Sequence, residues 1–227
     1  MGTKYRMTDE TIKVNGKTLH RIEAIADIPD ANVKKGDKGG FIKSEENLSQ
    51  EGDCWVSGNA QVSGNARVAC HACIRDNAMV SGNAQVSNNA QVSNNARVSE
   101  NAQVSGNTQV YDNAQVSGCA HIYEDAIVSG NAQVFGNAQV LGNAWVTDSA
   151  NVWNNAQVSG DTCVCDGARV SGEARVSGNA QVSGNAWVTD NAVVSGNAKV
   201  CGNAVVLDNA NVGGNAYVDS DARYAET

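Results

Sequence analysis

A six-residue repeat runs without interruption through most of the chain, and it limits the possible fold more than any other feature. Every sixth position from 56 to 218 is aliphatic, with 26 Val and two Ile at 28 sites, and no insertion breaks the register. The position four residues after each of these holds Ala at 26 of 28 sites, and Thr108 and Thr162 occupy the other two. One complete repeat unit has the sequence Val56-Ser57-Gly58-Asn59-Ala60-Gln61.

The chemistry of the phrase predicts a short strand followed by a turn. In an extended run of Ala, Gln and Val, alternate side chains share a face, so Ala and Val point inward and Gln points outward. Gly and Asn are the residue types that most readily adopt positive φ, so their pair places a turn in every repeat. A helix is excluded because a period of six does not match 3.6 residues per turn. Hairpins are excluded because strands this short cannot bury a face by pairing alone. Successive strands must therefore coil and stack in parallel.

The composition agrees with a narrow core of small side chains and limits the possible partners. Hydrophobic residues make up 41% of the chain but are mostly Ala and Val, and aromatic residues make up only 5%. The net charge is −8 and no basic patch is present, so we expect no nucleic-acid partner. The chain has seven cysteines, no signal peptide and no apolar run of membrane-spanning length. These features predict a reduced, cytoplasmic protein without membrane contact.

Residues 1–53 do not follow the repeat and are predicted to form a capping segment, with the β-helix over residues 54–227. Residues 11–14 and 17–22 flank Asn15-Gly16, the pair typical of a two-residue hairpin turn. The open end of a solenoid exposes unpaired strand edges and apolar core. We therefore interpret the hairpin segment as the cap of that end.

Two sets of residues resemble known proteins. An aliphatic and a small residue recurring every six positions resemble the hexapeptide-repeat, left-handed parallel β-helices. That resemblance implies an all-β, single-stranded triangular solenoid of about nine coils, each with 18 residues.

Residues 19–25 (LHRIEAI), 36–49 (GDKGGFIKSEENLS) and 54–56 (CWV) resemble the opening of the YdcK-like enterobacterial and prophage proteins. That family is often labelled acyltransferase, largely on the basis of the fold.

The hexapeptide acyltransferases supply an alternative function. In that class, the resemblance implies a trimer in which a histidine acts between subunits. His121 is the candidate base for an acyl-CoA-dependent reaction, because the carboxylate of Glu124 lies nearby in the sequence and could orient the imidazole. The repeat region contains none of the inserted loops that build the site in that class. We therefore expect no catalytic site and no cofactor.

One short segment offers candidate metal ligands. Cys70, His71 and Cys73 lie within four residues of one another. Zinc sites normally take a fourth ligand from elsewhere in the chain. On a triangular prism, Cys73 would lie on the face that adjoins the corner holding the other two. We therefore expect no metal at these residues.

Gln and Ser are the commonest residues at the outward positions, and one zone departs from this coat. Between residues 111 and 153, apolar side chains occupy outward positions on all three predicted faces, and we call this set the girdle. Apolar side chains in such a surface indicate a contact that is buried in a complex. A smaller second set lies near the C-terminal end. The girdle pairs Ile127 with Trp145, Phe135 with Trp153 and Tyr123 with Leu141, and adds Tyr111; the second set is Trp187, Val205 and Leu207.

The sequence thus predicts a non-enzymatic scaffold of the phage or prophage type. It would bind a protein partner through the girdle or associate with itself as a homo-oligomer, for which a trimer is the expected discrete form. Two alternatives stay open. One is the trimeric acyltransferase, and the other is an acidic rod that acts as a phage-encoded inhibitor of a host protein.

Overall fold

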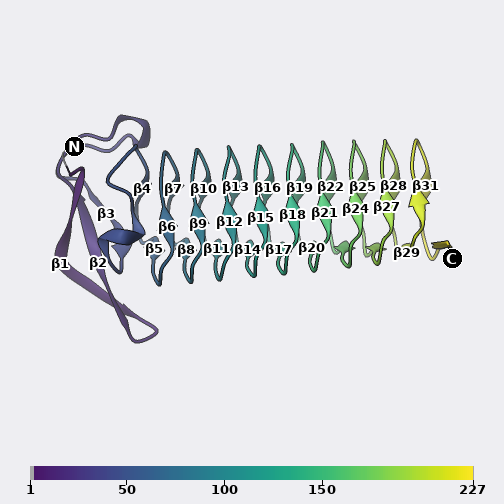
Figure 1. Cartoon of the computed structure of the whole chain (residues 1–227), viewed down its shortest axis with the longest axis horizontal. Helices are drawn as coiled ribbons and strands as arrows, with labels where there is room; N and C mark the ends of the chain where they lie inside the picture. The colour runs from purple at the N-terminus through teal and green to yellow at the C-terminus, as the bar shows by residue number, and fades with distance from the viewer. Residues whose placement is uncertain (1–2, 227) are drawn as a thin grey trace.

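The chain forms a hairpin cap followed by a long stack of coils, as described for residues 3–226 by a computed structural model (Figure 1). The strands form three sheets of 13, 10 and 9 strands. The coils contribute to these sheets in turn, so consecutive short strands lie on different sides of the stack. We call the outer surfaces of the three sheets the first, second and third face.

The strands of each sheet follow one another along the stack. The first sheet contains β1 (Tyr5–Val14), β2 (Lys17–Ala24), β3 (Lys38–Ile42), β5 (Gln61–Val62), β8 (Met79–Val80), β11 (Arg97–Val98), β14 (Gln115–Val116), β17 (Gln133–Val134), β20 (Asn151–Val152), β23 (Arg169–Val170), β26 (Trp187–Val188), β29 (Val205–Asp208) and β32 (Arg223–Glu226). The second contains β4 (Trp55–Val56), β7 (Cys73–Ile74), β10 (Gln91–Val92), β13 (Gln109–Val110), β16 (Ile127–Val128), β19 (Trp145–Val146), β22 (Cys163–Val164), β25 (Gln181–Val182), β28 (Lys199–Val200) and β31 (Tyr217–Val218). The third contains β6 (Arg67–Val68), β9 (Gln85–Val86), β12 (Gln103–Val104), β15 (His121–Ile122), β18 (Gln139–Val140), β21 (Gln157–Val158), β24 (Arg175–Val176), β27 (Val193–Val194) and β30 (Asn211–Val212).

The parallel register confirms the coil length predicted from the repeat. Gln91 pairs with Gln109 and Val92 with Val110, so neighbouring coils are offset by three repeats. The second sheet has ten strands, which makes the stack about ten coils long rather than the nine expected. The stacking begins before the repeat does, because β3 already pairs in parallel with β5.

The core is a column of stacked Val and Ala, as the alternation predicts. The Val and Ala of the coils have essentially no exposed surface along almost the whole stack. Each buried Val contributes about 1.5 kcal/mol relative to an exposed one. Thr108 and Thr162 replace Ala in this column, and the Oγ1 atom of each is buried without a hydrogen-bond partner among the described residues.

Every corner of the coils requires a residue with positive φ. The residues at every sixth position from 58 to 220 all have φ between 56° and 83°, and 15 of them are Gly. The sequence predicts a turn at each Gly-Asn pair, and the structure shows that the first residue of the pair takes the left-handed conformation. The Asn that follows instead joins a ladder along the corner. Within such a ladder, Nδ2 of Asn83 donates to Oδ1 of Asn101 at 2.9 Å.

Acidic residues at the left-handed positions bind the backbone of the next coil. Oε2 of Glu100 accepts a hydrogen bond from the Gly118 amide at 2.6 Å, and Oε2 of Glu124 accepts one from the Gly142 amide at 2.7 Å. Asp166 makes the same contact with the amide of a residue 18 positions later. Many of the acidic residues that give the repeat region its negative charge therefore join one coil to the next.

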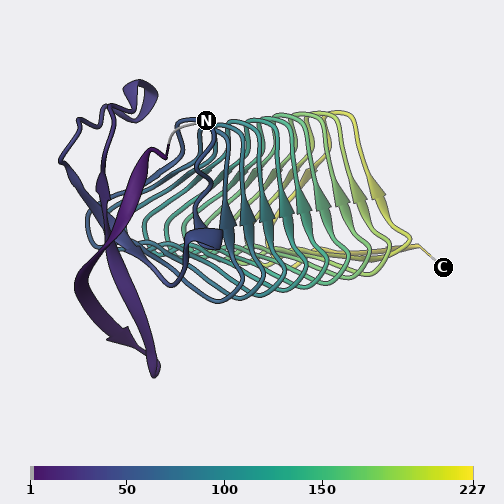
Figure 2. The ribbon, with the colours of Figure 1, turned by 60° about the vertical axis from the view of Figure 1, so that its left-hand side comes forward.

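The cap is an antiparallel hairpin that joins the stack through β3. Strands β1 and β2 turn at Asn15 and Gly16, both with positive φ, and β2 pairs with β3. Two short 3-10 helices, η1 (Pro29–Ala31) and η2 (Glu45–Asn47), lie in the loops on either side of β3. Figure 2 shows the hairpin at the N-terminal end of the stack, where it extends past the edge of the coils.

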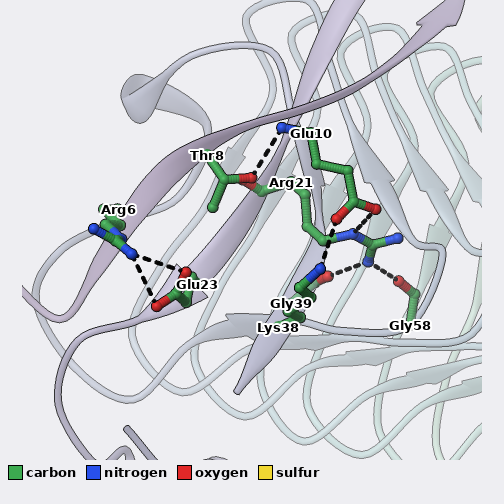
Figure 3. A network of polar contacts seen from close by, with 8 residues as sticks. All are labelled: Arg6, Thr8, Glu10, Arg21, Glu23, Lys38, Gly39 and Gly58. Atoms are coloured by element: carbon green, nitrogen blue, oxygen red, sulfur yellow. Dashed lines mark hydrogen bonds and ion pairs between the residues drawn. The ribbon is translucent and has the colours of Figure 1, made fainter. Parts of the chain in front are cut away.

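Polar contacts attach the hairpin to the first coils (Figure 3). Nη1 of Arg21 donates to the carbonyl of Gly39 at 2.7 Å, and its guanidinium lies 4.2 Å from the centre of the Phe41 ring. The carboxylate of Glu10 bridges Nε of Arg21 at 2.6 Å and Nζ of Lys38 at 2.9 Å. The hydrogen bonds from Lys38 and then Arg21 lower the pKa of Glu10.

Replacing Thr162 by Val is expected to stabilise the stack. The substitution keeps the shape of the side chain and removes a buried hydroxyl without a partner. We expect the free energy of unfolding to rise by about 1 kcal/mol, measured by thermal and urea denaturation. Thr147→Val is the control, because its hydroxyl already donates to Asp148 at 3.1 Å. A Thr162→Val protein no more stable than the wild type would contradict this.

The Glu10 contact predicts a pH dependence of stability. Because the folded-state pKa of Glu10 is lowered, the stabilisation is present above the ordinary Glu pKa of about 4.3 and is lost as the pH falls through the folded-state value. Other carboxylates also respond to acid, so Glu10→Gln serves as the reference. Between pH 6 and pH 3, the melting temperature should fall further in the wild type than in Glu10→Gln. Equal losses would show that this contact does not stabilise the cap.

Candidate interaction surface

Trp145 is the most exposed member of the girdle. It lies on β19 of the second face with 52% of its surface exposed, and its neighbour in register is Ile127 on β16. Tyr111 lies on the same face, half-buried, just after β13. The other outward positions of this face include Gln91 and Gln109. The apolar side chains of the second face therefore interrupt a polar column.

On the first face, Phe135 and Trp153 form a stacked aromatic pair. Their ring centroids are 5.9 Å apart and their planes are 7° from parallel. They follow β17 and β20, whose pairing places the two residues on neighbouring coils. Both rings are half-buried, since each covers part of the other. Each presents the rest of its surface to the solvent beside Ser and Asn.

The third face carries the remaining pair, Tyr123 and Leu141. Both are half-buried and follow β15 and β18, which pair with each other. The three pairs expected from the register are therefore neighbours in the structure, one pair on each face. Their role as a contact surface is not established by this placement and stays a prediction.

The second set lies on the first face, the same face as the stacked pair. Trp187 and Val205 are partners in register, and Leu207 also belongs to β29. The indole Nε1 of Trp187 donates to Oγ of Ser171 at 3.0 Å, which fixes the ring against the preceding coil. Trp187 is still 39% exposed. The first face thus carries both apolar sets along its length.

The structure does not bring His121 together with a carboxylate. His121 lies on β15 between Gln103 and Gln139, in a shallow hollow of about 340 Å³. The carboxylate of Glu124 is committed to the amide of Gly142 at 2.7 Å. No ion pair joins Glu124 to His121 in the part of the chain that the structure describes. The arrangement therefore lacks the oriented base that the acyltransferase alternative needs.

The three candidate metal ligands near residue 70 also do not converge. Cys70 is exposed at a corner, whereas Cys73 is buried on the second face beneath the cap. His71 instead faces the cap, where its Nδ1 lies 3.2 Å from Oδ2 of Asp30. Asp53 completes a group of possible ligand atoms around His71.

The seven cysteines are free thiols. Cys163 and Cys165 lie side by side on the second face. Burial, and then the neighbouring Cys163, raise the pKa of the Cys165 thiol to about 12. A thiol with a pKa this high is a poor nucleophile at neutral pH. This pair therefore offers no activated cysteine for group-transfer chemistry.

Sequence reasoning missed two kinds of residue. Tyr217 and Tyr224, 65% and 49% exposed, lie in the last coils, and the repeat register could have predicted that they point outward. The hydrogen bond with Cys201, and then the charge of Asp219, raise the pKa of Tyr217 to about 12. The position of Asp30 beside His71 could not be predicted from the repeat register, because Asp30 belongs to the non-repeating cap.

The stacked parallel coils define the class of the protein as a parallel β-solenoid. The sequence model of the YdcK beta solenoid repeat matches residues 60–70, 90–106, 168–182 and 180–196. The stacked coils therefore form a YdcK-like β-solenoid, which agrees with the resemblance found in the six-residue repeat.

Other comparisons add little to this assignment. Among solved structures, the chain is similar to the UDP-N-acetylglucosamine acyltransferase of Francisella novicida, with a TM-score of 0.30 and 15% sequence identity. The similarity covers 70% of this chain and spans 60% of that one, less than two thirds of its length. No curated protein sequence matches the chain. Within the described range, no helix has both the length and the apolar character needed to cross a membrane.

Proposed function

We propose that this protein is a non-enzymatic scaffold that makes protein contacts through the girdle, with a second copy of the chain as the partner. The observation that supports this most is the exposure of Trp145, 52%, between Ile127 and Cys163 on a face that holds Gln at 91, 109 and 181. The stacked Phe135–Trp153 pair adds a rigid aromatic platform on the adjoining face. A foreign protein is the other possible occupant.

Magnitudes favour these residues as the centre of a contact. Covering the exposed half of a Trp removes about 100 Å² from water, which is worth about 2–3 kcal/mol. Trp and Tyr dominate the energetics of protein interfaces when neighbouring residues exclude water around them. A standard interface buries about 800 Å² per partner, and a stack of ten strands at about 4.8 Å spacing offers a side about 45 Å long. The Gln and Ser positions around the girdle would form the polar rim.

The two alternatives have less support. An acyltransferase needs a base, and among residues 3–226 no carboxylate bonds to His121, since Glu124 binds a backbone amide instead. An acidic inhibitor needs free carboxylates, yet Glu100, Asp166 and others at the corners are engaged in joining the coils. The phage or prophage setting and the cytoplasmic location belong to the proposal through the resemblance to the YdcK-like proteins and the composition.

The double variant Trp145→Gln with Trp153→Ser tests the proposal. Each change introduces a residue that occupies the same column elsewhere, namely Gln109 and Ser171, so the coils should fold as before. We expect the wild type to sediment as an oligomer at tens of micromolar and the variant as a 23.6 kDa monomer. Sedimentation velocity gives the mass, and circular dichroism checks that the β-structure is retained.

A matched control distinguishes the girdle from the general surface. Gln85→Ser with Gln181→Ser changes two exposed outward positions outside the girdle and should leave the oligomer intact. A wild type that stays monomeric at several hundred micromolar would exclude self-association. An oligomer that persists in the Trp145→Gln, Trp153→Ser variant would exclude the girdle as its interface.

A further inference from the structure

One corner of the stack departs from its ladder where it meets the cap. Asn89 and Asn107 follow the usual pattern, in which Nδ2 of Asn89 donates to Oδ1 of Asn107 at 2.9 Å. The two preceding rungs of the same corner, 18 residues apart, hold His71 and Asp53 instead. An imidazole and a carboxylate thus replace two amides on neighbouring rungs. Both residue types are metal ligands, although a carboxylate can also serve the ladder, as Oδ1 of Asp125 does by accepting from Nδ2 of Asn107 at 2.8 Å.

The cap brings a third ligand to this corner. Asp30 lies in η1, and its Oδ2 is 3.2 Å from Nδ1 of His71. One ligand atom each from Asp30, Asp53 and His71 lie within 4.8 Å of one another. Ligands about 2.0–2.1 Å from a shared zinc ion are separated by about 3.0–3.4 Å, so the His71–Asp30 separation already suits coordination. The ligand atom of Asp53 lies within 4.8 Å of the other two, so each of its separations must shorten by no more than about 2 Å to complete the group.

A simple ion pair between Asp30 and His71 would leave Asp53 unexplained. The carboxylate of Asp53 has no hydrogen bond or ion pair with any residue in the range 3–226, although it is partly buried. Three segments that are separate in the sequence therefore converge with two carboxylates and one imidazole, a set that a shared metal ion would engage together. The two exposed partners can adjust their rotamers at little cost.

The group is open to solvent, since the side chains of His71 and Asp30 are 48% and 65% exposed, and a hollow lies nearby. It has a volume of about 290 Å³ and lies between the η1 loop and strands β4 and β7. Its lining includes Ala31, Trp55 and Cys73, which follow Asp30, Asp53 and His71 by one or two residues each. A three-ligand site requires an entry path for the ion and space for a bound water, and the solvent-exposed side of the group supplies both.

We propose that Asp30, Asp53 and His71 bind one divalent transition-metal ion, with zinc as the best fit, at the junction of the cap and the first coils. The imidazole favours zinc over magnesium or calcium, which take oxygen ligands. Three protein ligands leave a coordination position for water. The site is independent of the girdle, and its effect is to fix the η1 loop to the stack.

Titration of the full chain with zinc chloride tests the proposal. Isothermal calorimetry should show one ion per chain, and zinc should raise the melting temperature in a manner reversed by EDTA. His71→Asn should weaken zinc binding by about 10–100-fold or more, as should Asp53→Asn. His71→Asn restores the residue that the ladder uses at Asn89, so its fold should persist. Should that variant fail to fold by circular dichroism, Asp30→Asn and Asp53→Asn give the same test.

Two controls make the result specific to this group. His121→Gln removes a surface histidine elsewhere and should leave the zinc affinity unchanged. Cys70→Gly introduces the residue most common at that corner position and should also leave it unchanged, because no thiolate is part of the site. Absence of one-to-one binding at 100 µM zinc would overturn the proposal. So would an affinity that survives His71→Asn, or one that is lost in Cys70→Gly.

Discussion

The hydrogen bonding of each coil to the next, 18 residues further along the chain, is the interaction on which the structure depends. Backbone groups pair strand by strand only if every coil has the same length and turns at the same places. This requirement explains why no insertion occurs in the repeat and why every corner has a residue with positive φ. It also explains the small core, since identical coils stack best when identical Val and Ala side chains lie above one another.

The same constraint leaves the outward positions as the part of the repeat that can vary without cost to the fold. Gln and Ser are the commonest residues at these positions, and clustered departures from this coat therefore stand out. The girdle is a departure toward apolar side chains on three faces, with Trp145 the most exposed of them. The corner at Asp53 and His71 is a departure toward metal ligands, next to the cap. The acidic corner residues instead stabilise the stack, since the carboxylates of Glu100 and Glu124 accept hydrogen bonds from amides of the next coil.

Periodicity could predict what depends on position within the repeat. The inward Val and Ala, the three-repeat coil and the pairs Ile127–Trp145 and Phe135–Trp153 all follow from the register. The cap could not be predicted in the same way, because its contacts join segments of unrelated sequence. Nothing in the chain marks Glu10 as the bridge between Arg21 and Lys38, and nothing marks Asp30 as the neighbour of His71. The pairing of His121 with Glu124 failed because the corner amide of Gly142 takes the carboxylate, a use that is visible only once the coils are stacked.

The proposed contact between copies of the chain would bury the girdle. Hydroxyl-radical footprinting read by mass spectrometry tests it at single residues across a dilution series. If copies of the chain meet at the girdle, oxidation of Trp145 should decrease as the protein concentration rises from below one to tens of micromolar. Over the same range, oxidation of Tyr224, which is exposed outside the girdle, should stay constant. Oxidation of Trp145 that does not depend on protein concentration would show that the girdle is not buried between copies of the chain.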